Sequence, residues 1–446
     1  MNLKKIKSDL MLALSSQLFT KLLGFVVAAM LARHLDKSDM GEFFFAATYT
    51  WVFALLTELG TGKYLMRRIA EDEREVNSHL SDVLSLRVPL MATSFVLMNV
   101  AAWIFMTEQQ ALIVLLSGIY IYSGDLYFTF AAVLVGMQRL GYRCATSVVG
   151  PLVLVILVTI AIGLDWNLHQ ILGCYILAHL ALLGVTVSLI WVKFGHFEIF
   201  RGLAAGWRVA RDSFAFYLIL FLGILMFKVD TLMLRAIRSA EDVATYEAGY
   251  RIFEVSRFVV RPASMVFFPL CTRMAVRGQW AQFRSVFTKL MAVCAGLGLM
   301  MAVGMLLLGG WLIPAVWGGR YQSSIEVVRV LFLAVPALYL GFVSTFMASA
   351  LYLERAAVRI LFVCLVANIG LNSFSISRWG AIGAAWTTLI TEVVCAGLLI
   401  AVVLFRLRRL AHGTDADAVT RVPGDETHEV NDLEVARGIA ENDPSV

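Results

Sequence analysis

Charged residues are scarce in this chain. Asp, Glu, Lys and Arg make up 15% of its 446 residues, whereas hydrophobic residues make up 60% and the mean hydropathy is +0.79. A soluble domain is nearer about a quarter charged and about half apolar. The shortage of charge therefore excludes an ordinary soluble domain and predicts a chain embedded in lipid.

Cysteine pairs are also missing. The six cysteines lie inside or at the ends of apolar runs, and none forms a C-x-x-C pair: Cys144, Cys174, Cys271, Cys294, Cys364 and Cys395. This pattern predicts neither a metal site nor a disulfide framework. We expect these side chains to act as small hydrophobic packing residues.

Catalytic motifs are absent as well. The stretch LGTGKY at residues 59–64 resembles a phosphate-binding loop, but Thr57 stands where that motif needs Gly and Tyr64 where it needs Ser or Thr. Neither H-E-x-x-H nor G-x-S-x-G occurs, and the loops outside the apolar runs are short. We therefore expect no enzyme activity and no cofactor.

Long apolar runs take the place of charge. The first, from Leu10 to Ala32, follows a Lys-rich start but lacks a clear cleavage site, so we expect a retained transmembrane helix rather than a signal peptide. Runs of about 20 residues can cross a bilayer as helices. The sequence predicts twelve spans, at residues 10–33, 40–64, 86–106, 111–136, 144–163, 169–192, 213–236, 244–271, 286–309, 325–350, 358–376 and 381–405.

Positive charge is divided unevenly between the loops. With a cytoplasmic N-terminus, 22 Lys and Arg fall on the cytoplasmic side of these spans, and seven fall on the outer side: Arg33, Lys37, Arg235, Arg238, Arg320, Arg329 and Arg378. Such an excess marks the cytoplasmic side of a membrane protein. It predicts that both termini are cytoplasmic, and it explains the basic pI without a nucleic-acid partner.

The spans divide into two groups of six. We expect an N-terminal lobe over residues 1–192, a cytoplasmic interfacial linker with an amphipathic helix over 193–212, and a C-terminal lobe over 213–406. Residues 66–84 read as a charged, helical cytoplasmic loop. The remainder, 407–446, holds nine acidic residues and no long apolar run, which predicts a disordered acidic tail.

An internal repeat supports two lobes. A shift of 203 residues aligns LARHLDKSDMGEF (31–43) with LRAIRSAEDVATY (234–246), and a shift of 216 aligns residues 128–143 with 344–359. Because each lobe has an even number of spans, the repeats are expected to be parallel. Transporters with such repeats bind substrate between the lobes.

A charged stripe lies inside one apolar region. The stretch YEAGYRIFEVSRFVVR at residues 246–261 contains Glu247, Arg251, Glu254, Arg257 and Arg261. On a helix these charges share one face with Tyr250. Each charge at mid-membrane costs roughly 2.5–3.5 kcal/mol, so this face must meet protein or water. Three interpretations of the stripe are open. The charges can form ion pairs within the helix, such as Glu247 with Arg251; the helix can lie outside the membrane; or this face can line a water-filled cavity.

Other ionisable residues interrupt the spans and are candidates for function. They are Lys21, Asp125, Lys228, Asp230 and Glu392, with Glu58 and Lys63 at one end of a span. Together with the five charges of the stripe, these residues are six cations and six acids. This balance predicts a polar cavity, but not a purely cationic one.

Two stretches resemble a known family: residues 22–70, which begin LLGFVVAAMLARHLDKSDMGEF, and residues 228–270, which begin KVDTLMLRAIRSAEDVATYEAGY. They are similar to the polysaccharide flippases of the multidrug/oligosaccharidyl-lipid/polysaccharide (MOP) exporter superfamily, the Wzx-type proteins. The resemblance covers residues 5–405. It implies an all-α integral membrane protein with about 12 transmembrane helices, in two six-helix lobes around a central cavity that opens to each side in turn.

The resemblance also implies a function. Such proteins move a polyprenyl-diphosphate-linked oligosaccharide from the cytoplasmic to the outer leaflet of the bacterial inner membrane, for surface polysaccharide synthesis. Lipid and the polysaccharide polymerase machinery are the partners implied.

Site roles follow from the same resemblance. Substrate-binding roles fall on Lys21, Lys228, Tyr250, Arg251, Arg257 and Arg261, and coupling to a proton or sodium gradient falls on Asp125, Asp230, Glu254 and Glu392. Because Glu247 and Glu254 interleave the arginines, a purely cationic cavity is not expected. The alternatives are a cation-coupled multidrug antiporter of the same superfamily and a membrane-bound polysaccharide polymerase or ligase.

Overall fold

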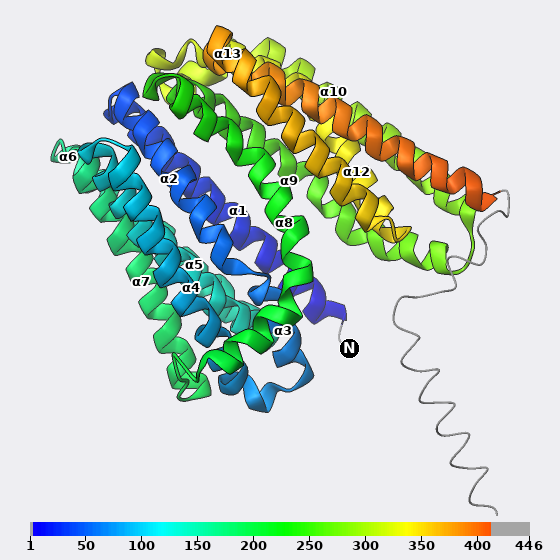
Figure 1. Cartoon of the computed structure of the whole chain (residues 1–446), viewed down its shortest axis with the longest axis horizontal. Helices are drawn as coiled ribbons and strands as arrows, with labels where there is room; N and C mark the ends of the chain where they lie inside the picture. Colours follow the sequence, from blue (N-terminus) through cyan, green and yellow to red (C-terminus); the bar gives the residue numbers. More distant parts are fainter. Residues whose placement is uncertain (1–2, 412–446) are drawn as a thin grey trace, which may run out of the picture. The chain divides into compact units, whose positions relative to one another are not determined.

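The structure is a computed structural model that describes residues 3–411, without the side chains of 3–14, of 411 and of several positions within 203–227 and 262–269. Its described residues form α-helices, two 3-10 helices and no strand (Figure 1). Helices suit this apolar chain because they satisfy their backbone hydrogen bonds internally. The predicted acidic tail lies, from residue 412 onward, outside the described residues.

The first part of the chain contains seven α-helices and one 3-10 helix: α1 (Leu3–His34), α2 (Lys37–Glu58), α3 (Thr61–Glu71), η1 (Glu73–Glu75), α4 (Val76–Phe105), α5 (Glu108–Gly136), α6 (Leu140–Gly163) and α7 (Leu168–Phe194). Two of them begin with a reciprocal cap, in which Thr107 pairs with Gln110 and Asn167 with Gln170. Within this part α5 packs against α2, α3, α4 and α7 (Figure 1), and the apolar side chains of α3, α4 and α5 form a core.

The second part contains α8 (Leu203–Ile237), α9 (Ala240–Val276), α10 (Trp280–Trp317), η2 (Gly319–Tyr321), α11 (Ser324–Leu333), α12 (Val335–Ala350) and α13 (Glu354–Ala411). Gly380 interrupts α13 with a φ of 55° and a ψ of −133°. The Ser375 hydroxyl lies 2.7 Å from that of Thr387, so the chain folds back there. The element is therefore two helices, and its break lies between the spans predicted at 358–376 and 381–405.

The helix ends follow the predicted repeat. α1 ends at His34 and α8 at Ile237, while α2 begins at Lys37 and α9 at Ala240. Both pairs are separated by 203 residues, the shift at which the sequences align. The repeat therefore describes equivalent helix–turn–helix units in the two parts of the chain.

The linker differs from the prediction. No separate interfacial helix forms: residues 195–202 are irregular, and α8 runs without a break from Leu203 to Ile237. Side chains of α4 hold this segment, because Asn77 donates to the Phe194 carbonyl, and the Ser81 and Ser85 hydroxyls accept from the backbone N–H groups of Glu198 and Arg201. An apolar face alone cannot reveal such backbone partners.

The number of spans is only partly supported. Among the described residues, eight helices are long and apolar enough to cross a membrane, or nine if the bent pair α11–α12 is one span. That set counts α13 once and omits α8 and α9, which carry charges along their length. The chain is thus a multi-pass membrane protein, and the count of twelve stays a prediction.

The chain divides into two compact units. The first contains residues 1–255, 302–334 and 361–391, and the second contains 256–301, 335–360 and 392–446. In the second unit α10 meets α12 closely, since a Cβ on Gly298 would lie 2.6 Å from the Pro336 Cα. The helices α9, α10 and α13 contribute to both units.

Candidate functional site

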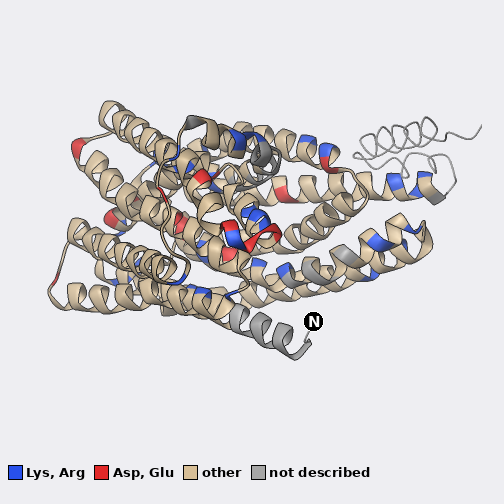
Figure 2. Cartoon of the chain, turned by 90° about the horizontal axis from the view of Figure 1, so that it is seen from below, with Lys and Arg blue, Asp and Glu red and all other residues tan. Residues whose placement is uncertain are grey.

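Isolated charges interrupt long uncharged stretches of helix (Figure 2). One of them, Asp230 on α8, lies in the first unit and is 2% exposed. Its carboxylate accepts hydrogen bonds from the Tyr246 hydroxyl at 2.7 Å, the Thr388 hydroxyl at 2.9 Å and the Asn372 amide at 2.6 Å. α8, α9 and both arms of α13 therefore converge on one carboxylate.

No Lys or Arg is bonded to Asp230 within the part of the chain that the structure describes. Its partners are two hydroxyl groups and the Asn372 amide nitrogen instead. The Asn372 amide also donates to the Asn368 side-chain oxygen at 2.9 Å, and the Asn368 amide donates to the Thr391 hydroxyl at 3.3 Å. The side-chain oxygen of Asn372 is buried without a hydrogen-bond partner. A buried carboxylate without a cationic neighbour is stable only if it gains a proton or a bound cation.

The sequence prediction named Asp230 but missed its partners. The overlooked signal is a set of neutral polar residues spaced by one helical turn in apolar spans, Asn368 with Asn372 and Thr388 with Thr391. Such pairs share a helix face. Residues of this kind in a membrane helix are candidates for a polar site even without charge.

Two further predicted residues join this cluster. The Lys228 ammonium lies 5.8 Å from the centre of the Tyr250 ring, and Tyr250 stacks on Tyr246 at 5.5 Å between ring centres. Tyr246 is in turn bonded to Asp230. The structure thus brings together Lys228, Asp230 and Tyr250, which the sequence had proposed separately.

Arg251 is placed differently. Its guanidinium carbon lies 4.3 Å from the centre of the Phe44 ring, and its Nε is buried without a hydrogen-bond partner. The neighbouring acid Glu247 is 3% exposed and accepts a hydrogen bond from Thr231 at 2.6 Å. Within the described residues Glu247 and Arg251 form no ion pair, so the pairing considered from their spacing is not made.

The remaining predicted residues are spread over the two units. Lys21 on α1 and Glu254 on α9 are exposed in the first unit. In the second unit Arg257 is half-buried, Glu392 is buried, and Arg261 is exposed with its guanidinium 5.1 Å from the Phe258 ring centre. Their roles stay predictions.

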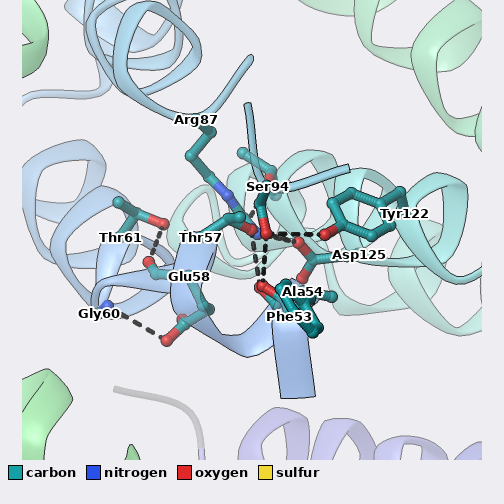
Figure 3. A network of polar contacts seen from close by, with 11 residues as sticks. Phe53, Ala54, Thr57, Glu58, Gly60, Thr61, Arg87, Ser94, Tyr122 and Asp125 are labelled. Carbon is teal, nitrogen blue, oxygen red and sulfur yellow. Dashed lines mark hydrogen bonds and ion pairs between the residues drawn. The ribbon is translucent and has the colours of Figure 1, made fainter. Parts of the chain in front are cut away.

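Asp125 on α5 belongs to a separate polar network (Figure 3). Its Oδ2 atom accepts from the Arg87 guanidinium and from the Thr57 hydroxyl, and Arg87 also donates to Thr129 at 2.6 Å. Arg87 is one of the 22 Lys and Arg that the sequence assigns to the cytoplasmic side, but its side chain is 1% exposed. Its position near the predicted start of a span concealed a buried ion pair.

Breaking this pair should destabilise the protein. Arg87→Leu leaves a half-buried carboxylate without its cation, and loss of one partner from a buried pair costs about 3–5 kcal/mol. We expect a clearly lower unfolding temperature in detergent, with most of the loss recovered in Arg87→Leu/Asp125→Leu. Arg139→Leu, at an exposed position, is the matched control. A double variant no more stable than Arg87→Leu would contradict this assignment.

The cations predicted on the outer side make a set of contacts of their own. The Arg235 guanidinium donates to both carboxylate oxygens of Glu42, at 2.6 to 3.3 Å, and Gln110 donates to the same carboxylate at 3.0 Å. Beside this pair, a Cβ on Gly41 would lie 1.8 Å from the Ala240 carbonyl oxygen. The N-terminal turns of α2 and α9 therefore touch.

Three more outer-side cations extend these contacts. Arg33 donates to the carbonyls of Ala315 and Val316, Lys37 to the Ser323 hydroxyl, and Arg320 to the Leu35 carbonyl and to Asp36. We call the contacts of residues 33–42 with 235–240 and 315–323 the outer seam. It lies wholly within the first unit.

Comparison with solved structures shows the fold. The chain matches the inward-facing conformation of a multidrug resistance MATE family transporter of the MOP superfamily with a TM-score of 0.74 and 14% identity, over 90% of this chain and 99% of that one. It matches the lipid II flippase MurJ, in an inward closed conformation, with a TM-score of 0.70 and 12% identity, over 90% of each chain.

A MOP superfamily transporter from Pyrococcus furiosus, described as having a binding pocket of reverse polarity, matches with a TM-score of 0.63 and 13% identity, over 90% of this chain and 94% of that one. No curated protein sequence matches the chain. The sequence profile of the family described as "Polysaccharide biosynthesis protein" matches residues 6–275. With the fold of a MOP transporter and this match over more than half its length, the chain belongs to the polysaccharide biosynthesis protein family, consistent with a Wzx-type flippase.

Proposed function

We propose that this protein flips a polyprenyl-diphosphate-linked oligosaccharide from the cytoplasmic to the outer leaflet, for the synthesis of a surface polysaccharide. The observation that carries the proposal is Arg251, a cation on a charged helix of a membrane transporter with no acid bonded to it among the described residues. A guanidinium in that environment favours an anion as its partner. The diphosphate of the lipid carrier is such an anion.

The chemistry of arginine suits this role. Its planar fork donates two hydrogen bonds to one phosphate, and charge-assisted bonds of this kind are about twice as strong as neutral ones. The Phe44 ring restrains the guanidinium by stacking and offers it no acceptor. Lys21, Lys228, Arg257 and Arg261 are further candidates for the diphosphate path, and Tyr250 supports Lys228.

The Asp230 cluster is the proposed coupling site. Hydroxyl, amide and carboxylate oxygens are the donors that a hard cation prefers, and the partnerless oxygen of Asn372 leaves capacity for a further ligand. These residues fit sodium, and Asp230 alone fits a proton. We therefore propose that a proton or sodium gradient drives transport and that no other cofactor is needed.

The remaining features of the proposal follow the sequence. They are twelve crossings in two lobes of the bacterial inner membrane, alternating access from a central cavity, cytoplasmic termini, and delivery of the product to polysaccharide polymerase machinery. The excess of Lys and Arg on one side of the spans supports this orientation. The MOP transporter fold supports a transporter rather than an enzyme.

The test measures lipid-linked oligosaccharide in cells that lack the protein and are complemented with variants. Wild type should clear full-length units from the inner leaflet, whereas Arg251→Gln should reduce clearance by about 10-fold or more, because a charge-assisted hydrogen bond contributes about 1.5–3 kcal/mol. Arg251→Lys should restore part of the activity. Arg359→Gln, at an exposed position on α13, serves as the control at equal expression.

Two outcomes would contradict the proposal. If cells without the protein accumulate no such intermediate but become sensitive to cationic drugs, the multidrug antiporter is the better assignment. If units reach the outer leaflet but stay unpolymerised, the polymerase or ligase is favoured.

A further inference from the structure

A cavity of about 550 Å³ lies in the first unit, among α4, α5, α7 and the linker at residues 195–202. Leu84 on α4, Phe130 on α5 and Val187 on α7 line it, and further apolar side chains complete most of its wall. Ligand pockets in proteins usually measure about 300–1,000 Å³, so this cavity has room for a sizeable organic group. Within the described part of the chain, no residue of the Asp230 cluster or of the outer seam lines it.

The linker forms one wall of this cavity, and α4 holds it in place. The Ser81 hydroxyl accepts from the Glu198 backbone N–H at 2.8 Å, and the Ser85 hydroxyl accepts from that of Arg201 at 2.6 Å. Beyond the linker, a Cβ on Gly206 would lie 3.1 Å from the Ser85 carbonyl oxygen, so the start of α8 also packs closely on α4. The cavity therefore lies between three helices and a linker whose backbone is bonded to one of them.

The interior of the cavity is apolar. Leu84 and Phe130 are 1% and 4% exposed, and the Phe197 ring of the linker packs on Phe130 with 5.4 Å between ring centres. The titratable residues of the described lining are His196 and Glu198, and both are exposed to solvent. A water molecule inside a protein needs about two to four polar partners, which the buried side chains of this wall do not offer. An apolar chain therefore suits the interior.

The surface beside the cavity is apolar and exposed. Leu177, Val185 and Val192 of α7 are between 45% and 81% exposed, and such a surface on a multi-pass membrane protein meets the bilayer. Trp191 lines the cavity and is itself 56% exposed, so it joins the cavity to this surface. Tryptophan is enriched where a membrane meets water. The lipid of the bilayer is thus the apolar molecule that borders the cavity.

The linker adds charges of both signs beside the cavity. The Arg201 guanidinium lies 3.6 Å from the Glu198 carboxylate and 3.8 Å from that of Asp82. Lys193, in the last turn of α7, forms no ion pair among the described residues, and its ammonium lies 5.8 Å from the Tyr142 ring centre. These two cations and two acids balance one another, and they match a headgroup that carries both a phosphate and an ammonium. A diphosphate is disfavoured there, because the acids repel it.

We propose that this cavity binds a zwitterionic phospholipid of the adjoining leaflet, with one acyl chain inside the cavity and the headgroup at the linker. Glu198 binds the ammonium of the headgroup, while Lys193 and Arg201 bind its phosphate through charge-assisted hydrogen bonds. The bound lipid holds the linker against α4 and α7 and so fixes the start of α8, the helix that carries Asp230. The inference goes beyond the flippase function and does not depend on it.

Hydrogen–deuterium exchange on the delipidated, full-length protein in detergent tests this site. Phosphatidylethanolamine at about ten times its dissociation constant should slow amide exchange in residues 195–202 about 10-fold, because the linker opens only after the lipid leaves. Phosphatidylglycerol, which has a net negative headgroup, should protect the linker less. Glu198→Gln should bring the two lipids to the same level, because it removes both the partner of the ammonium and the repulsion of the anion.

A substitution that fills the cavity tests the place of the acyl chain. Val187→Phe adds an apolar ring to the wall on α7 and should abolish protection of the linker by phosphatidylethanolamine. The unfolding temperature of the delipidated variant should stay constant or rise, because the ring packs where the chain binds. Val185→Phe, the same change at a 45% exposed position on α7, is the matched control and should keep full protection.

Four results would overturn the proposal. The first is exchange in wild type that phosphatidylethanolamine does not slow, which needs no variant and so does not depend on how Val187→Phe folds. The second is full protection in Val187→Phe, because the chain would then lie elsewhere. Equal protection by phosphatidylglycerol would show that the linker charges do not select the headgroup. Stronger protection by polyprenyl diphosphate than by phosphatidylethanolamine would assign the cavity to the tail of a transported lipid.

Discussion

Asp230→Asn should abolish the response of transport to an ion gradient. The substitution keeps the size of the side chain and its capacity to accept from Tyr246, but it removes the negative charge of the cluster. Asn can neither gain a proton nor supply the negative charge that balances a bound cation, so the cycle loses its driving ion. In proteoliposomes with an imposed proton or sodium gradient, we expect gradient-driven flipping to fall about 100-fold, equivalent to about 2.8 kcal/mol.

The same variant should remain folded. A neutral amide is less costly to bury than a carboxylate without a cationic partner, so the unfolding temperature should stay constant or rise. Asp165→Asn, at an exposed carboxylate, is the matched control and should leave coupling unchanged. Gradient-driven flipping that survives in Asp230→Asn would remove this cluster from the coupling mechanism. Whether the proton or the sodium gradient drives wild type identifies the ion.

Arg235→Gln should weaken the outer seam and favour an outward-open state. Arg235 holds Glu42 through both carboxylate oxygens, and the two side chains are only 23% and 15% exposed. The stabilisation by a partly buried ion pair is expected to lie between that of an exposed pair and that of a buried pair. Loss of this pair should therefore destabilise the closed seam by roughly 1–3 kcal/mol. The ratio of seam-open to seam-closed molecules should rise about 10- to 100-fold.

Distances between two spin labels, measured by double electron–electron resonance, can follow the opening of the seam. Spin labels at Ser38 on α2 and Ser239, beside the start of α9, in a background without the six native cysteines, should report a short distance in the wild type. Arg235→Gln and Glu42→Gln should add a longer distance, and the swap Glu42→Arg/Arg235→Glu should restore the short one. Unchanged distances in both single variants would show that this pair does not control the seam. Arg378→Gln is the control, at a cation predicted on the outer side whose guanidinium lies 4.8 Å from the Phe374 ring centre.

Much of this architecture follows from local sequence. Apolar runs longer than a bilayer determine the membrane environment, because lipid tolerates few charges and demands internally bonded backbone. The repeat at a shift of 203 residues anticipated equivalent helix ends at His34 and Ile237, since short polar turns between apolar runs mark where helices stop. The position of Asp230 inside a predicted span also marked it as a candidate, because charge persists there only with a function or a partner.

The partners of each charge were decided by tertiary structure. Asn372 and Thr388 meet Asp230 from 142 and 158 residues away, and helical periodicity says which face a residue occupies but not which helix it faces. For the same reason, spacing suggested Glu247 as the partner of Arg251. In the structure Thr231 donates a hydrogen bond to Glu247, and the Phe44 ring lies against the Arg251 guanidinium. Arg87 looked like an orienting loop cation until packing buried it against Asp125. The sequence by itself therefore determined the class of protein, its helices and the charges worth examining, while long-range contacts decided which of those charges are paired.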